Sequence, residues 1–314
     1  MPRTADDSWD IATSVGATAV MVALARAAET ASDNPLIRDQ FAEPLVSTPE
    51  LVGVREQVAA WWAPTPDPGS EADPDLTVDS QQMIDYQAAR THFFDTYFAD
   101  AAGAGIRQAV LLAAGLDSRA YRLDWPDGTT VYEIDLPKVL EYKERTLAAH
   151  GVGPVADRRP VPVDLRHDWP QALRDSGFDP SRPAAWLAEG LLPFLPASTQ
   201  EAMFASVDAL SGPGSRVAVE IFVFNQHKRQ QAQQKWAQLR AEREAPGPNG
   251  SDDSFNPFDL WFDDEGRPDP ADWFTAHGWA TLSVEARDEA VRLGRPPGPD
   301  DGPFANRFMT AAKP

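Results

Sequence analysis

The chain has no cysteine among its 314 residues. This absence excludes disulfide bonds, thiolate zinc sites and cysteine nucleophiles. Histidine is scarce, and no two histidines stand three or four residues apart, which is the spacing that places two ligands on one helical face. The five are His92, His150, His167, His227 and His277. The sequence therefore predicts no metal site.

Basic residues are also few, with 28 Lys and Arg against 48 Asp and Glu and a formal net charge of −20. Such a surface repels phosphate backbones and anionic lipid head groups, so neither nucleic acid nor membrane is expected as a partner. No apolar run approaches the roughly 18 residues of a membrane span. The first ten residues, MPRTADDSWD, lack the apolar segment of a signal peptide. A cytoplasmic protein is therefore expected.

From residue 108 onward, short apolar runs alternate with helix-length segments, the pattern of a parallel sheet with crossover helices. Five strands are predicted, at 108–115, 129–135, 158–165, 184–190 and 215–222. Two more, at 279–287 and 304–312, are expected to pair antiparallel because no helix is predicted between them. The first hundred residues are expected to be mainly helical, with helices over 17–31 and 80–102.

The chain is predicted to form a single domain over residues 1–314. A helical cap is expected over 1–105 and the sheet-containing core over 106–314, with a lid insertion at about 225–268. The aromatic residues of that insertion are candidates to line a substrate pocket, whereas its basic residues are expected to form a solvated face. These aromatic residues are Phe255, Phe258, Trp261 and Phe262. The sequence leaves the oligomeric state open.

Ligands of such sheets bind beyond the carboxyl ends of the strands, so the residues at those ends are the candidate site. Gly115 ends the first strand, and Asp135 ends the second. They are 20 residues apart. In nucleotide-binding sheets, the acid that hydrogen-bonds the ribose hydroxyls usually follows the glycine turn by about 20 residues. The alternative is that Asp135 caps the following helix.

The glycine-rich turn of a dinucleotide site, G-x-G-x-x-G, is largely missing here. The segment AAGLDS at 113–118 matches only its central glycine, and Asp117 would repel a diphosphate by about a kcal/mol. Alternatively, Asp117 caps the next helix. An adenosine ligand without phosphate and with positive charge, such as S-adenosylmethionine, avoids the repulsion. Two functions remain open besides that of an enzyme that uses S-adenosylmethionine. One is an NAD(P)-dependent oxidoreductase, which the missing glycines disfavour, and the other is a non-catalytic protein that binds S-adenosylmethionine.

Three segments together resemble a known family. They are VLLAAGLDSRAYRLDWPDGTTVYEIDLPKVLEYK, VPVDLRHDWPQAL and WLAEGLLPFLP. The chain resembles the S-adenosylmethionine-dependent methyltransferases related to leucine carboxyl methyltransferase, and most of all their high-GC bacterial, mycobacterial-type branch. The resemblance implies a class I, Rossmann-like α/β fold: a mostly parallel seven-stranded sheet with an antiparallel C-terminal strand. It also implies methyl transfer to an oxygen, carboxylate or hydroxyl, of an unidentified small-molecule acceptor.

The resemblance also assigns roles to residues. It implies that Gly115 lies against the methionine part of the cofactor and that Asp135 binds the ribose. Asp164 and Leu165 would frame the adenine. Arg90 would pair with the cofactor's carboxylate, and Glu189 would lie near the sulfonium. Ala113 departs from the usual class I turn, where a glycine stands.

Several of these residues have a structural alternative. Arg90 could be a snorkelling arginine or part of a structural ion pair, and Asp164 could cap the DWPQALRDSG helix. Glu189 could be a buried acid bonded to backbone. No catalytic residue is identified; a hydroxyl acceptor would need a general base, for which Glu189 and His167 are the candidates.

Overall fold

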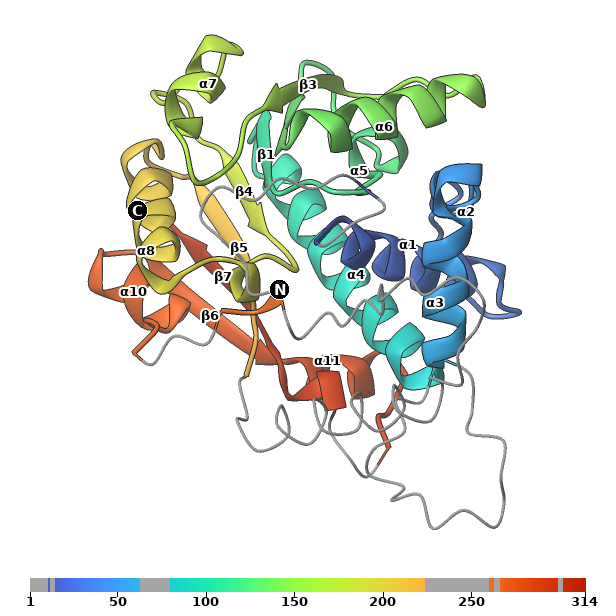
Figure 1. Cartoon of the computed structure of the whole chain (residues 1–314). Helices are drawn as coiled ribbons and strands as arrows, with labels where there is room; N and C mark the ends of the chain where they lie inside the picture. Colours follow the sequence, from blue (N-terminus) through green and yellow to red (C-terminus); the bar gives the residue numbers. More distant parts are fainter. Residues whose placement is uncertain (1–10, 12–14, 63–79, 224–259, 263–265, 299–301) are drawn as a thin grey trace.

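The computed structural model describes residues 11, 15–62, 80–223, 260–262, 266–298 and 302–314. Its centre is a seven-stranded sheet with the order β3-β2-β1-β4-β5-β7-β6 (Figure 1). Strands β1 to β5 run parallel, and β7 lies antiparallel between β5 and β6. The strands are β1 Gln108–Leu112, β2 Thr130–Asp135, β3 Asp157–Pro162, β4 Ala185–Ala188, β5 Arg216–Ile221, β6 Ala280–Glu285 and β7 Arg307–Ala312.

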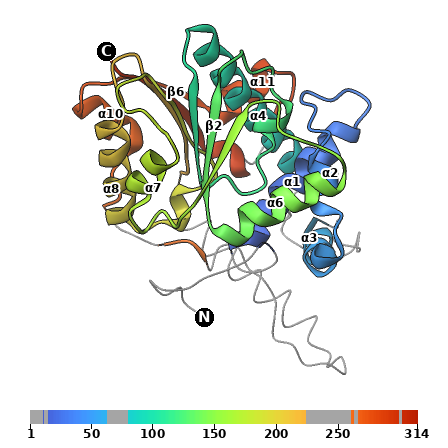
Figure 2. The ribbon, with the colours of Figure 1, turned by 90° about the horizontal axis from the view of Figure 1, so that it is seen from above.

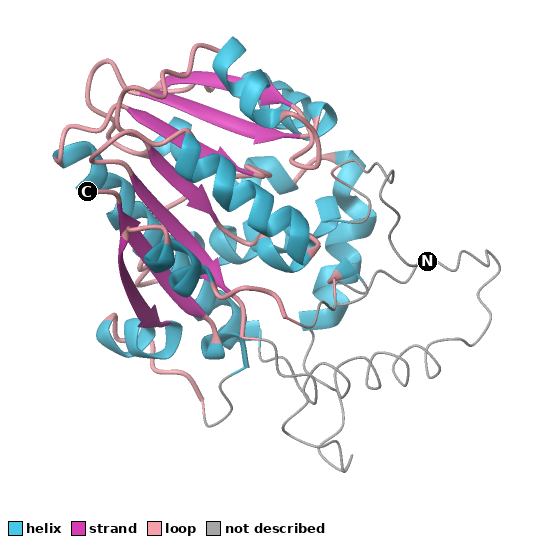
Figure 3. Ribbon diagram, turned by 90° about the vertical axis from the view of Figure 1, so that its left-hand side faces the viewer, coloured by secondary structure: helices cyan, strands magenta, loops and turns pink. Residues whose placement is uncertain are grey.

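Helices cover both faces of the sheet, which gives three layers (Figures 2 and 3). One face carries α7 (Trp169–Asp175), α8 (Ala197–Ala209) and α10 (Pro270–Ala276). The other carries α4 (Ser80–Gly103), α5 (Arg119–Arg122), α6 (Pro137–Ala149) and α11 (Ala286–Arg292). Within the described parts of the chain, no helix combines the length and apolar character needed to cross a bilayer.

The N-terminal helices form a cap beside the second face of the sheet. Helix α1 (Val15–Ala31) packs against α4, α2 (Ala42–Val46) and α3 (Val52–Trp62). Short 3-10 turns lie at η1 (Pro49–Leu51), η3 (Leu192–Phe194) and η5 (Gly302–Ala305). The cap reaches the sheet through α4, whose buried aromatic side chains Phe94 and Phe98 join the same core as β1.

The central strands β1, β2, β4 and β5 are buried on both faces, as expected for parallel strands between helices, whereas the edge strands β3 and β6 are largely exposed. Along β4, Leu187 faces the α4 side, while Trp186 and Ala188 face the α8 side. In β5 the same alternation directs Ala218 toward α4 and Val219 toward α8. Because side chains alternate with a period of two, Glu220 joins Ala218 on the α4 side, which matters for the site below.

The predicted fold class is confirmed, and all seven strands form close to their predicted positions, although each is shorter than predicted. The predicted absence of a helix between the last two strands is wrong, because residues 286–292 form α11. The strand predicted at 279–287 ends in the structure at Glu285, the last residue of β6. Ala286 and Ala290 pack into the core on the α4 side, so this segment gains more burial as a helix. Most of the predicted lid lies outside the described residues.

Candidate functional site

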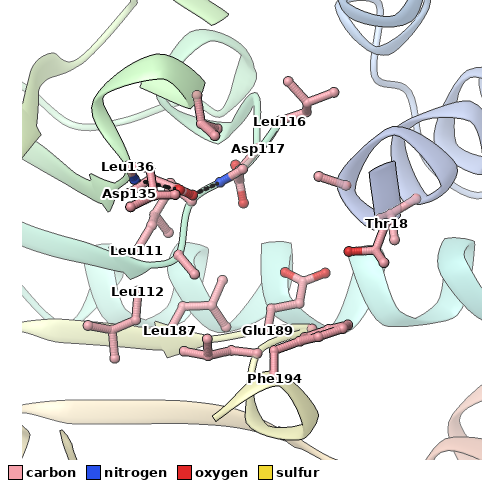
Figure 4. Close-up of a pocket in the computed structure, with 18 of the residues that line it drawn as sticks. Thr18, Leu111, Leu112, Leu116, Asp117, Asp135, Leu136, Leu187, Glu189 and Phe194 are labelled. Carbon is pink, nitrogen blue, oxygen red and sulfur yellow. Dashed lines mark hydrogen bonds between the residues drawn. The ribbon is translucent and has the colours of Figure 1, made fainter. Parts of the chain in front are cut away.

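A pocket lies where the carboxyl ends of β1, β2 and β4 meet, with α1 along one side (Figure 4). All six residues predicted to bind a cofactor line it. They are Arg90, Gly115, Asp135, Asp164, Leu165 and Glu189. The chain folds these positions together because parallel strands end at one edge of the sheet. His167 is exposed and does not line this pocket, so the structure does not bring it to the other candidates.

Gly115 and Asp135 are joined directly by a hydrogen bond. The Gly115 N–H donates to Asp135 Oδ2 at 2.6 Å, and the Leu136 N–H donates to Oδ1 at 2.7 Å (Figure 4). The helix α6 begins with Leu136 as its N-cap, and no side chain caps it. The capping alternative for Asp135 is therefore not realised. Its carboxylate instead ties the turn after β1 to the end of β2.

The turn after β1 needs left-handed backbone at two positions. Gly115 has φ +46°, which a glycine adopts without penalty. Ala113 has φ +58° and is the one described residue other than glycine with positive φ. The alanine that replaces the usual class I glycine therefore keeps the backbone conformation for which a glycine is suited, at a cost of about 1–2 kcal/mol.

Asp135 is the carboxylate of the pocket wall that no cation among the described residues holds. The arginines that line the pocket form ion pairs with other carboxylates, whereas within the described parts of the chain Asp135 accepts only backbone N–H groups. Burial raises the pKa of Asp135, although the Gly115 and Leu136 N–H groups and Lys143 oppose the rise. Its remaining lone pairs are available to accept hydrogen bonds from a ligand.

Asp164 is held by its neighbour Arg166. Its Oδ1 accepts from the Arg166 N–H at 2.8 Å, and the Arg166 guanidinium bonds both carboxylate oxygens. Burial works to raise the pKa of Asp164, but the bonds from Arg166 outweigh it and lower the pKa. The N-cap of α7 is Asp168, not Asp164. The capping alternative for Asp164 is therefore wrong, and Leu165 stands beside it in the pocket wall.

Glu189 lies between two guanidinium groups. Its Oε1 is 2.8 Å from Arg90 Nε, and its Oε2 accepts from Arg119 Nη1 at 2.7 Å. The side chain remains 12% exposed, toward the pocket. The alternative of an acid bonded to backbone is therefore not what forms. Both oxygens therefore carry an arginine partner.

Arg90 is buried and also pairs with Glu220 on β5. Its Nη1 donates to Glu220 Oε2 at 2.9 Å, the oxygen that also accepts the Gly190 N–H at 2.7 Å. The Tyr86 hydroxyl donates to the other oxygen of Glu220. Burial raises the pKa of Glu220, and Arg90 opposes this. The snorkelling alternative for Arg90 is therefore wrong, whereas the alternative of a structural ion pair is realised.

Asp117 does not present a free charge to the pocket. Its Oδ1 accepts from the Arg119 N–H at 2.7 Å, and its Oδ2 pairs with the Arg119 guanidinium. Burial raises the pKa of Asp117, but Arg119 and Lys143 together bring it below its ordinary value. The expected repulsion of a diphosphate by Asp117 is thus largely neutralised by Arg119. The missing glycines remain the stronger argument against a dinucleotide.

Sequence reasoning missed Arg119 and Glu220, the partners that hold Glu189 and Arg90. Arg119 had a recognisable signal, because an arginine this close to the end of an apolar strand needs a compensating partner if it is buried. Glu220 also had one, as a charged residue inside an apolar strand. Neither signal names the partner.

We expect Gly115→Ala to lower the free energy of unfolding by about 1–2 kcal/mol through its positive φ. The added Cβ would also lie 3.3 Å from Ala19 Cβ on α1. Gly151→Ala is the matched control, since its φ is +72° and nothing lies within 4 Å of the added atom. Thermal melts should show similar losses, but only the Gly115 variant should bind the cofactor more weakly. Equal cofactor affinity in both variants would show that the turn tolerates a side chain.

The sequence model of the leucine carboxyl methyltransferase family matches residues 19–208, which is more than half of the chain. The chain belongs to the leucine carboxyl methyltransferase family. The match covers most of the pocket lining, from α1 through the end of β4 to α8. The predicted family is thereby confirmed, and the protein is a methyltransferase, which decides against the NAD(P)-dependent alternative.

Proteins that are similar to this chain support its assignment to the family. A Mycobacterium marinum protein is 73% identical over the full length of both chains. A Mycobacterium avium protein is 54% identical over 94% of this chain and 88% of its own. Both are named S-adenosyl-L-methionine-dependent methyltransferases. The crystal structure of a Thermobifida fusca protein described as a methyltransferase has a TM-score of 0.50 at 18% identity, over 86% of this chain and 92% of its own, and supports the fold.

Proposed function

We propose that this methyltransferase transfers a methyl group to a carboxylate oxygen of a small-molecule acceptor. The cofactor is S-adenosyl-L-methionine, as the family membership and the names of the relatives indicate. The observation that carries the site is Asp135: a half-buried carboxylate beside the left-handed Gly115 turn, with no cation bound to it among the described residues.

The residues of the pocket fit this cofactor. Asp135 offers carboxylate lone pairs to the two ribose hydroxyls, and Leu165 supplies an apolar surface for the adenine, next to Asp164. Glu189 places negative charge at the end of β4, where it would stabilise a sulfonium. Arg90 would face the carboxylate of the cofactor, as the family resemblance implies, while it also holds Glu189.

When bound, the cofactor supplies an electrophilic methyl group on a sulfonium. The acceptor oxygen forms the new carbon–oxygen bond as the carbon–sulfur bond breaks, so the positive charge on sulfur disappears. The protein's contribution is to hold the acceptor oxygen close to the methyl group, near 3 Å, in a site that excludes water. Arg90 and Arg119 contribute by fixing Glu189 in place.

A carboxylate acceptor is favoured because, apart from Asp135, which is proposed to bind the ribose, the described pocket offers no general base that is not already paired. Both oxygens of Glu189 are paired with arginines, and His167 is exposed outside the pocket lining. A hydroxyl acceptor would need such a base to remove its proton. A carboxylate is already ionised at neutral pH and needs none.

The acceptor end of the pocket is lined by α1 and by the η3 turn. Figure 4 shows Glu189 reaching from the end of β4 toward Thr18 on α1, with Phe194 beside it. Leu191 and Leu195 flank Phe194 in the lining. This mainly apolar surface suits a small acceptor with an apolar body next to its carboxylate.

Calorimetric titration tests the cofactor, and product chemistry tests the acceptor class. We expect S-adenosylmethionine and S-adenosylhomocysteine to bind and NAD(H) not to bind. Methylation of a panel of apolar carboxylic acids and of phenols and alcohols should then yield products that release methanol in alkali, as esters do and ethers do not. Alkali-stable products would identify a hydroxyl acceptor, and tight NAD(H) binding without response to the adenosylated ligands would contradict the function altogether. Binding without turnover on any acceptor would point to a non-catalytic cofactor-binding protein.

A further inference from the structure

A buried lysine lies directly behind the turn after β1, residues 113–117, which is the proposed cofactor turn. Lys143 on α6 is fully buried, and its Nζ donates to the Asp117 carbonyl at 3.0 Å. The same Nζ is 2.9 Å from Glu133 Oε2 on β2. Lys143 does not line the pocket, so it would not touch a ligand there. A fully buried lysine is costly unless it is paired, and here both partners belong to the segments that hold the pocket.

These two contacts connect Lys143 to both cofactor-binding segments. Asp117 closes the turn after β1, with its N–H bonded to the Ala114 carbonyl at 2.8 Å. Glu133 stands two residues before Asp135, so their side chains leave β2 on the same face. Fixing the Asp117 carbonyl therefore fixes the backbone that presents the Gly115 N–H to Asp135.

We propose that Lys143 is a positioning residue, which holds the turn that presents the Gly115 N–H to Asp135 and thereby sets the affinity of this turn for its ligand. The inference rests on the proposed binding of the cofactor ribose by Asp135. The positive charge of Lys143 favours the ionised carboxylate, and the negative charge of Glu133 disfavours it. In agreement with this arrangement, Lys143 lowers the pKa of Asp135 and Glu133 raises it, within a rise that burial dominates.

The other charges that the structure describes around Asp135 form pairs with one another. Arg26 on α1 pairs with Asp39, and Arg158 on β3 donates to Glu133 at 2.7 Å. The turn, the loop after β3 and the end of β4 contribute further pairs, namely Asp117 with Arg119, Asp164 with Arg166, and Glu189 with Arg90 and Arg119. Replacing Lys143 leaves all of these in place, and Glu133 keeps Arg158 as a partner.

The test compares Lys143→Met with Lys138→Met, an exposed lysine on the same helix. We expect Lys143→Met to weaken S-adenosylmethionine binding about tenfold at neutral pH, the effect typical of losing a charged hydrogen bond. Affinity falls on acidification as Asp135 becomes protonated, and the midpoint of that fall should move to higher pH in Lys143→Met. Lys138→Met should match the parent in both measurements.

Glu133→Gln provides the opposite test, because it removes the charge that disfavours the ionised form of Asp135. The midpoint of the fall in affinity on acidification should move to lower pH in Glu133→Gln. This variant decides between a positioning role and a purely structural role if Lys143→Met does not fold. A purely structural role for Lys143 predicts lower melting temperatures with unchanged affinity and midpoints, and that result would overturn the proposal. Carbon-13 titration of the Asp135 carboxyl in the ligand-free variants should show the same opposite shifts. This readout stands even if the parent binds no S-adenosylmethionine, a result that would contradict the proposed function instead.

Discussion

Arg90→Met should lower the free energy of unfolding by about 3–5 kcal/mol, the loss typical of removing one partner from a buried ion pair. Glu220 is fully buried, and Arg90 is the cation 2.9 Å from its carboxylate. Without Arg90, the Glu220 charge keeps, among the described residues, the Gly190 N–H and the Tyr86 hydroxyl as its partners. Glu189 also loses one of its two arginines. Chemical denaturation of the purified variants measures the loss.

The pH dependence of Arg90→Met should identify Glu220 as the cause. Burial raises the folded-state pKa of Glu220 above its unfolded value, and the loss of Arg90 raises it further. A raised carboxyl pKa means that stability is present at low pH and falls as the pH rises through the folded pKa. The deficit of the variant should therefore shrink toward acidic pH, where protonated Glu220 needs no cation.

Two controls separate this network from ordinary loss of charge. Arg145→Met removes an exposed arginine paired with Glu50 and should change stability by no more than about 1 kcal/mol. Arg90→Met combined with Glu220→Gln should recover part of the loss, because the buried charge is gone. If Arg90→Met is as stable as the parent and only cofactor affinity falls, then Arg90 serves the ligand and the ion pairs contribute little.

Asp135→Ala should weaken S-adenosylmethionine binding by about 1.5–3 kcal/mol, as expected for losing hydrogen bonds to a charged group. This corresponds to roughly a 10- to 150-fold increase in the dissociation constant. The variant loses the acceptor proposed for the ribose hydroxyls and also releases the Gly115 N–H. Calorimetric titration at neutral pH measures the change.

Asp100→Ala removes an exposed carboxylate from α4 and should leave the affinity as it is. Asp135→Ala should reduce thermal stability less than Arg90→Met does, because burying the Asp135 charge is itself unfavourable. An unchanged dissociation constant together with a lower melting temperature would show that Asp135 supports only the turn.

The sequence by itself determined the strands, the class of sheet and most of the pocket wall. Strand positions follow from short apolar runs, which are local in the chain. Gly115 and Asp135 could be predicted because each ends a strand, and the ends of neighbouring parallel strands meet at one edge of the sheet. For the same reason Asp164 and Glu189 were predicted to join them, and all four line one pocket.

Only the tertiary structure decided how the charges pair. Arg90 and Glu220 are 130 residues apart. Their contact depends on the helical period of α4 and on the alternation of side chains along β5, and the sequence does not show how these two elements pack against each other. Glu220 points toward α4 because strand side chains alternate, and Arg90 meets it because α4 docks with that turn of its helix over β5. The same holds for Lys143, whose partners on the turn and on β2 become neighbours only when α6 packs on the sheet. Local pattern decides where each charge stands along its own element, but the packing of one element against another decides which charges lose their water and must find each other.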